Sequence, residues 1–261
     1  MTIQFDKYQG AGNDFILLDN RAGTVPSLSQ TQIEQLCDRH KGIGADGLII
    51  IHTDEASDFS MQYFNANGNE STLCGNGGRC AVAFAHHKKI ITQQTSFRAI
   101  DGIHTAHYFD ASKVELKMAA VSDISQEGEA FVLDTGSPHY IKTVPAVDQI
   151  SVAKEGAAIR YAERFQPGGL NVNFIEQLSP THYKIRTYER GVEGETLACG
   201  TGTVAAAIAM HYSGASENAN VLIFDAPGGR LTVSFQVAEG TYHTIYLTGP
   251  AEFVFSGSIE V

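Results

Sequence analysis

Two stretches half a chain apart decide how this sequence folds. They are Tyr63-Phe-Asn-Ala-Asn-Gly-Asn-Glu-Ser-Thr-Leu-Cys-Gly-Asn-Gly77 and Tyr188-Glu-Arg-Gly-Val-Glu-Gly-Glu-Thr-Leu-Ala-Cys-Gly-Thr-Gly202. They align without a gap at an offset of 125 residues, the separation of Cys74 from Cys199. Self-similarity on this scale predicts two related halves of one chain.

Weaker matches extend the repeat toward the N-terminus of each half. Gly12-Asn13 aligns with Gly136-Ser137 at an offset of 124, and Asp46-Gly47 aligns with Asn171-Val172 at 125. Because these matches keep nearly one register, we expect two domains facing each other across a pseudo-twofold axis. The expected boundaries are 1–118 plus 250–261 for the domain with Cys74, and 119–249 for the domain with Cys199.

Each half places Cys-Gly-x-Gly at the start of an apolar segment, 74–85 in one and 199–209 in the other. We expect both segments to be helices, and the second, which is apolar nearly all round, to be buried inside its domain. The start of a buried helix offers unpaired backbone N–H groups and the positive end of the helix dipole. Such a place binds a carboxylate and lowers the pKa of a thiol, so Cys74 and Cys199 are the candidates for chemistry.

The rest of the chain is dominated by short β-type runs such as 47–51, 131–133 and 231–235. Helical patterns lie near 29–39, 78–88, 148–158 and 202–212. This alternation predicts an α/β (α+β) fold in which strands outnumber helices.

Composition excludes several classes of protein. The chain has 261 residues, 43% hydrophobic and 18% charged, which is typical of a folded protein and not of a disordered one. A net charge of -11 argues against nucleic acid or an anionic membrane as partner. The sequence has neither a secretory signal pattern nor an apolar run long enough to span a membrane, so we expect a cytoplasmic protein.

The four cysteines are Cys37, Cys74, Cys80 and Cys199, and their spacing matches no zinc motif, so we expect no metal. Cys37 and Cys80 have no repeated context and are expected to be packing residues. The stretch 10–15, Gly-Ala-Gly-Asn-Asp-Phe, resembles the start of a dinucleotide motif, but Phe15 stands where its third glycine belongs. A nucleotide site is therefore not expected.

Two activated thiols suit the inversion of a stereocentre. One thiolate removes a proton from one face of a carbon while a thiol delivers a proton to the opposite face, and the roles exchange with the direction of reaction. The carbanion next to a carboxylate can be stabilised by helix N-termini without a cofactor.

At these residues the sequence resembles the diaminopimelate epimerase family over nearly the whole chain. The resemblance runs through 10–15, 42–48, 64–68, 74–77, 171–174, 188–191, 195–202, 227–231 and 248–251. It implies a cofactor-independent isomerase that interconverts LL- and meso-diaminopimelate in lysine and peptidoglycan precursor biosynthesis. It also implies a homodimer of chains with two pseudo-symmetric domains, each a strongly curved sheet around a central helix.

Carried over by position, the resemblance implies that Cys74 and Cys199 form the acid–base pair. The expected carboxylate-binding residues at the helix starts are Gly75, Asn76, Gly200 and Thr201. The other expected substrate ligands are Asn13, Asn65, Asn171, Glu189 and Arg190. His139 and Glu189 are expected to tune the thiols.

Two positions depart from the family pattern. Position 137 is Ser where many members have Asn, and position 47 is Gly where some members have Gln, so Gly47 could contact a substrate only through its backbone. Two alternatives stay open: another racemase of the same fold, such as a proline racemase relative, or a thiol-based redox or binding protein. The sequence leaves open which cysteine is the thiolate at rest.

Overall fold

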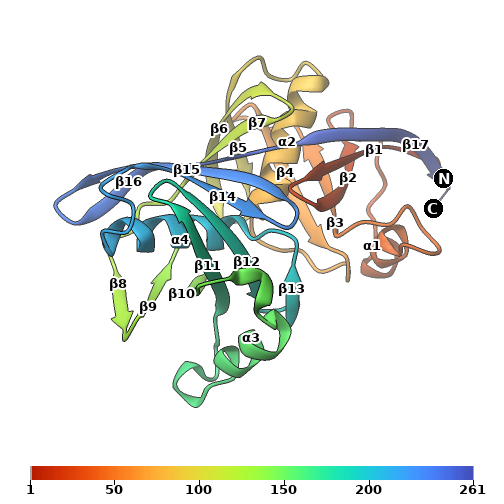
Figure 1. Cartoon of the computed structure of the whole chain (residues 1–261). Coiled ribbons are helices and arrows are strands. Elements are labelled where there is room, and N and C mark those ends of the chain that lie inside the picture. The colour runs from red at the N-terminus through yellow and green to blue at the C-terminus, as the bar shows by residue number, and fades with distance from the viewer. Residues whose placement is uncertain (1, 261) are drawn as a thin grey trace. The chain divides into compact units, whose positions relative to one another are not determined.

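The computed structural model describes residues 2–260 and divides them into two compact units. Unit 1 holds the residues up to Leu116 together with those from Gly249 onward, and unit 2 holds Lys117–Thr248. Unit 1 is coloured red to yellow, with its C-terminal strand in dark blue, and most of unit 2 is green to light blue (Figure 1).

Unit 1 is built on a curved mixed sheet whose strands follow the order β17-β1-β2-β3-β4-β5-β6-β7. The pairs β2/β3 and β4/β5 are parallel and the other neighbours are antiparallel. The first and last strands of the chain, β1 and β17, lie side by side (Figure 1). The strands are β1 (Thr2–Gly10), β2 (Asn13–Asp19), β3 (Gly47–His52), β4 (Phe59–Asn65), β5 (Gln94–Ala99), β6 (Gly102–Asp110), β7 (Lys113–Met118) and β17 (Glu252–Glu260).

Unit 2 repeats this topology with the strand order β8-β9-β10-β11-β12-β14-β15-β16. Its parallel pairs, β10/β11 and β12/β14, stand at the same places in the order as those of unit 1. The predicted relation between the two halves is therefore confirmed in their strand topology. The strands are β8 (Ile124–Glu127), β9 (Ala130–Asp134), β10 (Pro138–Thr143), β11 (Asn171–Ser179), β12 (His182–Glu189), β13 (Gly194–Thr196), β14 (Val221–Ala226), β15 (Gly229–Ala238) and β16 (Thr241–Gly249), with β13 paired to β12.

Each sheet wraps around one central helix. In unit 1, α2 (Gly75–His87) contacts β1, β2, β3 and β6, and in unit 2, α4 (Gly200–Tyr212) contacts the corresponding β9, β10, β11 and β15. Alanine and other small apolar residues fill both helices, which lets the sheets close tightly on them and exclude water. Both helices begin two or three residues before the predicted starts, because Cys74 and Cys199 occupy their N-cap positions.

Two short helices cover the outer faces of the sheets. The helix α1 (Gln30–Cys37) links β2 to β3 and begins at a capping box formed by Ser29 and Gln32. The helix α3 (Val152–Arg160) links β10 to β11, later than its predicted range because residues 147–149 form a separate 3-10 turn. A second 3-10 turn covers Glu163–Phe165.

The glycine-rich stretch near residue 10 is the turn of a hairpin. Gly10 pairs with Asn13 across β1 and β2, and Ala11 and Gly12 both have positive φ values, of 52° and 90°. Two such residues in a row form the tight turn that connects twisted antiparallel strands. The glycines therefore serve the hairpin, since a strand and not a helix follows them.

The strand pairing corrects one detail of the predicted repeat. Phe15 pairs with Gly47 in unit 1, and His139 pairs with Asn171 at the same place in unit 2. Gly47, and not Asp46, is thus the counterpart of Asn171. The offset is 124 in these strands and 125 at the central helices, so one extra residue lies in unit 2 between β11 and α4.

Among residues 2–260, the structure contains no helix with the length and hydrophobicity needed to cross a lipid bilayer. The same residues contain no group of three or more His, Cys, Asp or Glu side chains arranged to hold a metal ion.

Candidate active site

The candidate residues gather at the same topological place in each unit, around the start of the central helix. In unit 1 they are at the starts of β2 and β3, the end of β4 and the start of α2. In unit 2 they are at the starts of β10 and β11, the end of β12 and the start of α4. Parallel strands begin at a common edge and an antiparallel neighbour ends there, so the fold brings residues distant in sequence to one helix N-terminus.

Cys74 is the N-cap residue of α2, with φ −84° and ψ 126°, and its side chain is partly exposed. Its carbonyl accepts a 2.7 Å hydrogen bond from the amide of Gly78, which closes the first turn of the helix. The next residues, Gly75 and Asn76, are buried and lie in that first turn, where backbone N–H groups point toward the helix start. A sulfur atom at this place lies in the positive end of the helix dipole.

Side-chain hydrogen bonds connect the first turn of α2 to residues at the starts of β2 and β3. The Asn76 Nδ2 atom donates to Asn13 Oδ1 at 2.5 Å, and the Asn13 Nδ2 atom donates to Asp46 Oδ2 at 2.9 Å. On its other side, Asn76 Oδ1 accepts a 2.7 Å hydrogen bond from the guanidinium of Arg79. Asn13 and Asn76, both expected ligands, are therefore in direct contact with each other.

Asn65 and Gly47 face each other across β3 and β4. The Asn65 Oδ1 atom accepts a 2.9 Å hydrogen bond from the Tyr63 hydroxyl, which orients the amide. A Cβ atom at position 47 would stand 2.6 Å from the Phe64 carbonyl oxygen and 2.6 Å from the Tyr63 ring. Glycine is the residue that fits there, and Gly47 offers only backbone atoms.

Cys199 caps α4 as Cys74 caps α2, with φ −117° and ψ 112°, but it is buried, with 9% exposure. Its Sγ atom lies 3.5 Å from the hydroxyl of Thr201, in the first turn of the helix. Gly202 completes this turn, and a Cβ atom there would stand 2.3 Å from Asn173 Oδ1, so any larger residue would displace the Asn173 side chain. The start of α4 is therefore packed directly on the side chain of Asn173.

A buried imidazole completes this end of unit 2. His139 is fully buried, and its Nε2 atom lies 3.0 Å from both the Ser137 and Thr201 hydroxyls. Its Nδ1 atom lies 3.1 Å from Asn173 Nδ2, which can only donate, so Nδ1 accepts and Nε2 carries the hydrogen. Hydrogen bonds thus connect the ring through Thr201 to the sulfur of Cys199.

His139 is neutral at physiological pH. Burial, and to a smaller degree the charge of Arg190, lower its pKa to about 3. A charged imidazole would lose its hydration in this site, whereas the neutral ring satisfies both nitrogen atoms. The group next to Cys199 is therefore a hydrogen-bond donor and not a cation.

The expected distal ligands of unit 2 surround Asn171, which is 4% exposed. Its Nδ2 atom donates to the Ser137 hydroxyl at 3.1 Å, and its Oδ1 atom accepts from the backbone N–H of Arg190 at 2.8 Å. Glu189 ends β12 and is partly buried, while Arg190 is exposed and its guanidinium donates to the carbonyl oxygens of Gly168 and Gly169 at 3.4 and 3.5 Å. Ser137 is thus held in the same network as His139 and Thr201.

Three polar residues of these networks were not singled out from the sequence: Arg79, Asn173 and Thr187. Arg79 is the one charged residue among the buried positions of α2, a signal that the printed sequence does contain. Asn173 accepts from the Thr187 hydroxyl at 2.8 Å and donates to the Tyr140 carbonyl, both inside the sheet. Such partners could not be inferred from residue spacing alone.

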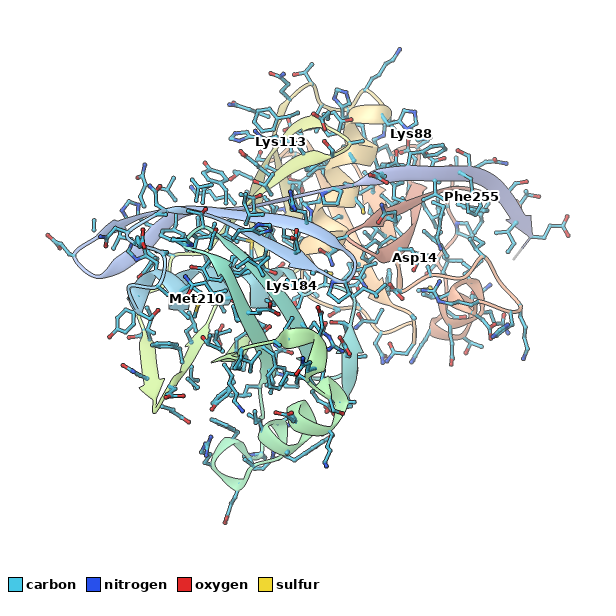
Figure 2. All side chains as sticks on the ribbon, viewed as in Figure 1. Asp14, Lys88, Lys113, Lys184, Met210 and Phe255 are labelled. Carbon is cyan, nitrogen blue, oxygen red and sulfur yellow. The ribbon has the colours of Figure 1, made fainter. Side chains whose placement is uncertain are left out.

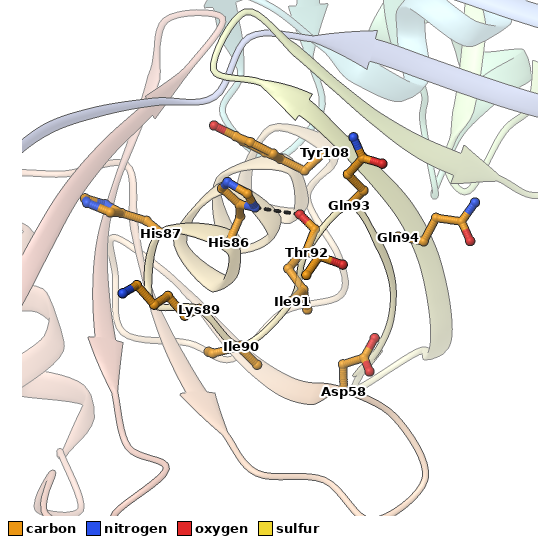
Figure 3. Close-up of a pocket in the computed structure, with 10 residues that line it drawn as sticks. All are labelled: Asp58, His86, His87, Lys89, Ile90, Ile91, Thr92, Gln93, Gln94 and Tyr108. Atoms are coloured by element: carbon orange, nitrogen blue, oxygen red, sulfur yellow. Dashed lines mark hydrogen bonds between the residues drawn. The ribbon is translucent and has the colours of Figure 1, made fainter.

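A surface pocket of about 1040 Å³ lies at the opposite end of α2 and contains none of the candidate residues (Figure 3). There His86 stacks on Tyr108 and its Nδ1 atom lies 2.6 Å from the Thr92 carbonyl oxygen (Figure 3). The 13-residue helix separates this pocket from Cys74 by roughly 20 Å. The pocket therefore has no part in chemistry at the thiol.

The sequence is similar to those of known proteins over nearly its whole length. The sequence profile described as "Diaminopimelate epimerase" matches residues 5–122 and 131–254. A diaminopimelate epimerase of Flavobacterium psychrophilum is 48% identical, covering 97% of this chain and 98% of the relative. One from Chlorobaculum tepidum is 44% identical, covering 97% and 99%.

Solved structures with low sequence identity show the fold. A PhzF-family phenazine biosynthesis protein of Bacillus anthracis has a TM-score of 0.79 at 14% identity and covers all of both chains. A hydroxyproline epimerase of Agrobacterium vitis, solved with bound trans-4-hydroxy-L-proline, has a TM-score of 0.69 at 15% identity, covering 99% of this chain and 92% of that one.

Proposed function

The chain belongs to the diaminopimelate epimerase family, and on that premise we propose that Cys74 and Cys199 are the two acid–base groups of its reaction. The reaction interconverts LL- and meso-diaminopimelate, so it inverts one of two amino-acid centres and leaves the other unchanged. The observation that carries the proposal is the presence of one cysteine at the N-cap of each central helix, in two units of the same topology.

In each turnover, one cysteine acts as base and the other as acid. The thiolate takes the proton from the α-carbon, and the electron pair of the broken C–H bond moves into the adjacent carboxylate. The thiol then delivers its own proton to the opposite face of the carbon. One thiolate and one thiol remain, with their roles exchanged, so the reverse reaction can follow directly.

Carboxylate recognition is assigned to the first turns of α2 and α4. We propose that the backbone N–H groups near Gly75 and Asn76, and near Gly200 and Thr201, bind the carboxylate whose charge grows during proton removal. Preorganised donors of this type contribute about 2.7–4 kcal/mol each to transition-state stabilisation. This electrostatic role is the one for which other enzymes use a cofactor, and the proposal requires none.

The distal amino-acid end of the substrate is assigned to the polar residues around the two helix starts. A guanidinium such as that of Arg190 suits the distal carboxylate, and Glu189 suits the distal ammonium. The proposed ligands are Asn13, Asn65, Asn171, Glu189 and Arg190, together with Ser137 through its hydroxyl and Gly47 through its backbone. His139 and Glu189 are proposed to tune the thiols.

The proposal can be tested by hydrogen exchange. LL-diaminopimelate incubated with the protein in deuterated water should give meso product with one deuterium at the inverted α-carbon, measured by NMR and mass spectrometry. The Cys74→Ala and Cys199→Ala variants serve as controls and should give neither inversion nor labelled product. Absence of exchange by the unchanged protein at every pH from 6 to 9 would overturn the proposal. L-Proline in the same assay tests the racemase alternative.

We also propose that the protein works as a homodimer in the cytoplasm, as the family resemblance implies. The strand β17 is the last strand in the order of unit 1, and Phe255 lies on it (Figure 2). The side chains of Phe253, Val254 and Phe255 are 44–51% exposed. Exposed apolar side chains on an edge strand favour pairing with a second copy. Light scattering should therefore give twice the mass of one chain, and Val254→Lys should shift it toward a single chain.

A further inference from the structure

Arg79 is a fully buried arginine in the second turn of α2, five residues after Cys74. Arginine is almost never fully buried without a charged partner, because removing a cation from water costs several kcal/mol. The side chain has no exposed surface, so it cannot bind substrate directly. Its burial therefore requires another explanation.

The hydrogen bonds of Arg79 all go to neutral oxygen atoms. Nη1 donates to the Gly75 carbonyl at 3.3 Å, Nη2 to Asn76 Oδ1 at 2.7 Å, and Nε to the Pro250 carbonyl at 3.4 Å. Within the described part of the chain, no carboxylate forms an ion pair with this guanidinium. The positive charge is thus held by neutral groups next to the first turn of α2.

Burial lowers the pKa of Arg79, and two thiols oppose this shift, first that of Cys80 on the same helix and then that of the N-cap Cys74. Burial raises the pKa of Cys80 far above its usual range, so this thiol stays protonated. Cys74 is partly exposed at the helix start, where the dipole also favours an anion. Cys74 is therefore the group that can supply the negative charge.

The other ionisable groups packed around the start of α2 do not change the conclusion that Cys74 supplies the negative charge beside Arg79. Burial raises the pKa of Tyr8 on β1, which keeps that hydroxyl neutral. Burial would also raise the pKa of Asp14 on β2, but hydrogen bonds from Arg39 and Lys7 outweigh it and lower that pKa to about 2. Asp14 is ionised but already has two cations of its own, and Arg39 also pairs with Asp46.

Unit 2 places no such cation inside its central helix. The residue of α4 at the position of Arg79 is Val204, at the offset of 125, and it is fully buried. The ring next to Cys199 is the neutral His139, which donates a hydrogen bond but carries no charge. In a medium of low dielectric, a nearby full positive charge stabilises a thiolate more than a hydrogen bond from a neutral group does.

We propose that Arg79 is a positioning residue for the epimerase reaction, whose buried charge holds Cys74 as the thiolate and leaves Cys199 as the thiol in the substrate-free protein. This assignment rests on the proposed function of the two cysteines as an acid–base pair. It makes the substrate-free protein ready to act on the isomer whose α-hydrogen faces Cys74, and the other isomer needs the proton to move from Cys199 to Cys74 first.

The test is the pH dependence of alkylation at each thiol in the substrate-free protein. Iodoacetamide reacts with thiolates, and mass spectrometry of the two cysteine peptides gives a separate midpoint for Cys74 and Cys199. The Cys74 midpoint should lie at least one pH unit below that of Cys199, because a neighbouring opposite charge shifts a pKa by about 1–3 units. Equal midpoints, or a lower midpoint for Cys199, would overturn the assignment.

Two variants separate the charge of Arg79 from its packing. Arg79→Met removes the charge at similar length and should raise the Cys74 midpoint by about 1–3 units, while Arg79→Lys should raise it by less than half as much. The Cys199 midpoint should stay constant in both. Val204→Met, at the matching position of α4, should move neither midpoint.

A purely structural role for Arg79 predicts a different result. Arg79→Met would then lower the unfolding temperature without moving the Cys74 midpoint relative to that of Cys199, which contradicts the proposal. If Arg79→Met does not fold, the unchanged protein and Arg79→Lys still decide between the two. Alkylation requires no turnover, so a protein that shows these midpoints but does not epimerise diaminopimelate would contradict only the proposed function.

Discussion

The starts of α2 and α4 have the same type of backbone cap, but the side chains packed around them differ in polarity and charge. Each begins with a cysteine N-cap followed by Gly-x-Gly, inside a sheet of the same strand order. In unit 1 these side chains are the apolar ring of Phe15 on β2 and the cation of Arg79 within α2. The corresponding places beside α4 hold the neutral ring of His139 and the apolar Val204.

A repeated scaffold can therefore give two identical thiols different tasks. The helix dipole and the N-cap geometry belong to the backbone and are therefore the same in both units. The charge state of a thiol also depends on the side chains packed behind it, and these differ. An acid–base pair needs one proton donor and one proton acceptor at a time, so unequal environments suit it.

The largest effect should come from the thiols themselves. Cys74→Ser and Cys199→Ser should each lower kcat for epimerisation by about 10²–10⁴-fold, since each removes one partner of the proton transfer. A rate assay with LL-diaminopimelate measures this loss, and circular dichroism checks the fold. A variant that retains full turnover would show that its thiol is not part of the pair.

The next largest effect should be a difference in unfolding free energy between matched substitutions inside the two units. Asn173→Leu removes the hydrogen bonds to the Thr187 hydroxyl, the His139 Nδ1 atom and the Tyr140 carbonyl, and should cost about 3 kcal/mol of unfolding free energy. Its counterpart in β3 is Ile49, at the offset of 124, and Ile49→Leu should cost less than about 1.5 kcal/mol. Denaturant titrations of both variants give the comparison, and equal losses would contradict it.

The glycine pair Gly77 and Gly202 should respond unequally to the same substitution. A Cβ atom at 202 would stand 2.3 Å from Asn173 Oδ1, whereas one at 77 would lie 3.3 Å from the terminal carbon of Ile49. Gly202→Ala should therefore cost about 1–3 kcal/mol, while Gly77→Ala should be close to neutral, because helix propensity favours alanine. Thermal unfolding measures both, and a stable Gly202→Ala protein would show that Asn173 can move.

The smallest effect should appear as a pH dependence of stability. The folded protein holds His139 with a pKa of about 3, whereas the unfolded chain binds a proton there below about pH 6.5. The unfolded state thus binds more protons as the pH falls, so this group lowers stability as the pH falls below about 6.5, by about 2 kcal/mol at pH 5.

The His139→Gln variant isolates this contribution from that of the carboxylates. The stability difference between the unchanged protein and the variant should shrink by about 2 kcal/mol from pH 6.5 to pH 5. Urea titrations at both pH values measure it. A difference that stays constant with pH would mean that His139 titrates normally in the folded protein.

Much of the fold could be predicted because short sequence motifs reveal the repeat. The Cys-Gly-x-Gly motifs before apolar segments predicted two central helices, and the shared offset predicted two related units. The errors were local ones of register and start position. The sequence aligned Asp46 with Asn171, because a one-residue shift between strands and helices is invisible without strand pairing.

The candidate site was accessible to sequence analysis where residues lie next to the motifs. The motif itself predicts Cys74 and Cys199, and the family resemblance implies Gly75, Asn76, Gly200 and Thr201 beside them. The partners of Asn173 and Thr187 lie on other strands and could not be predicted from the sequence, and neither could the complete burial of Arg79.

The positions of the two thiols follow from local sequence, since an N-cap and its helix are set by neighbouring residues. The surroundings of each thiol depend on how the whole domain packs. Burial makes the imidazole of His139 neutral and encloses the charge of Arg79, and burial is a property of the packed sheet and helix together. Electrostatic energies depend on that surrounding medium, and therefore the difference between the two halves emerges only after folding.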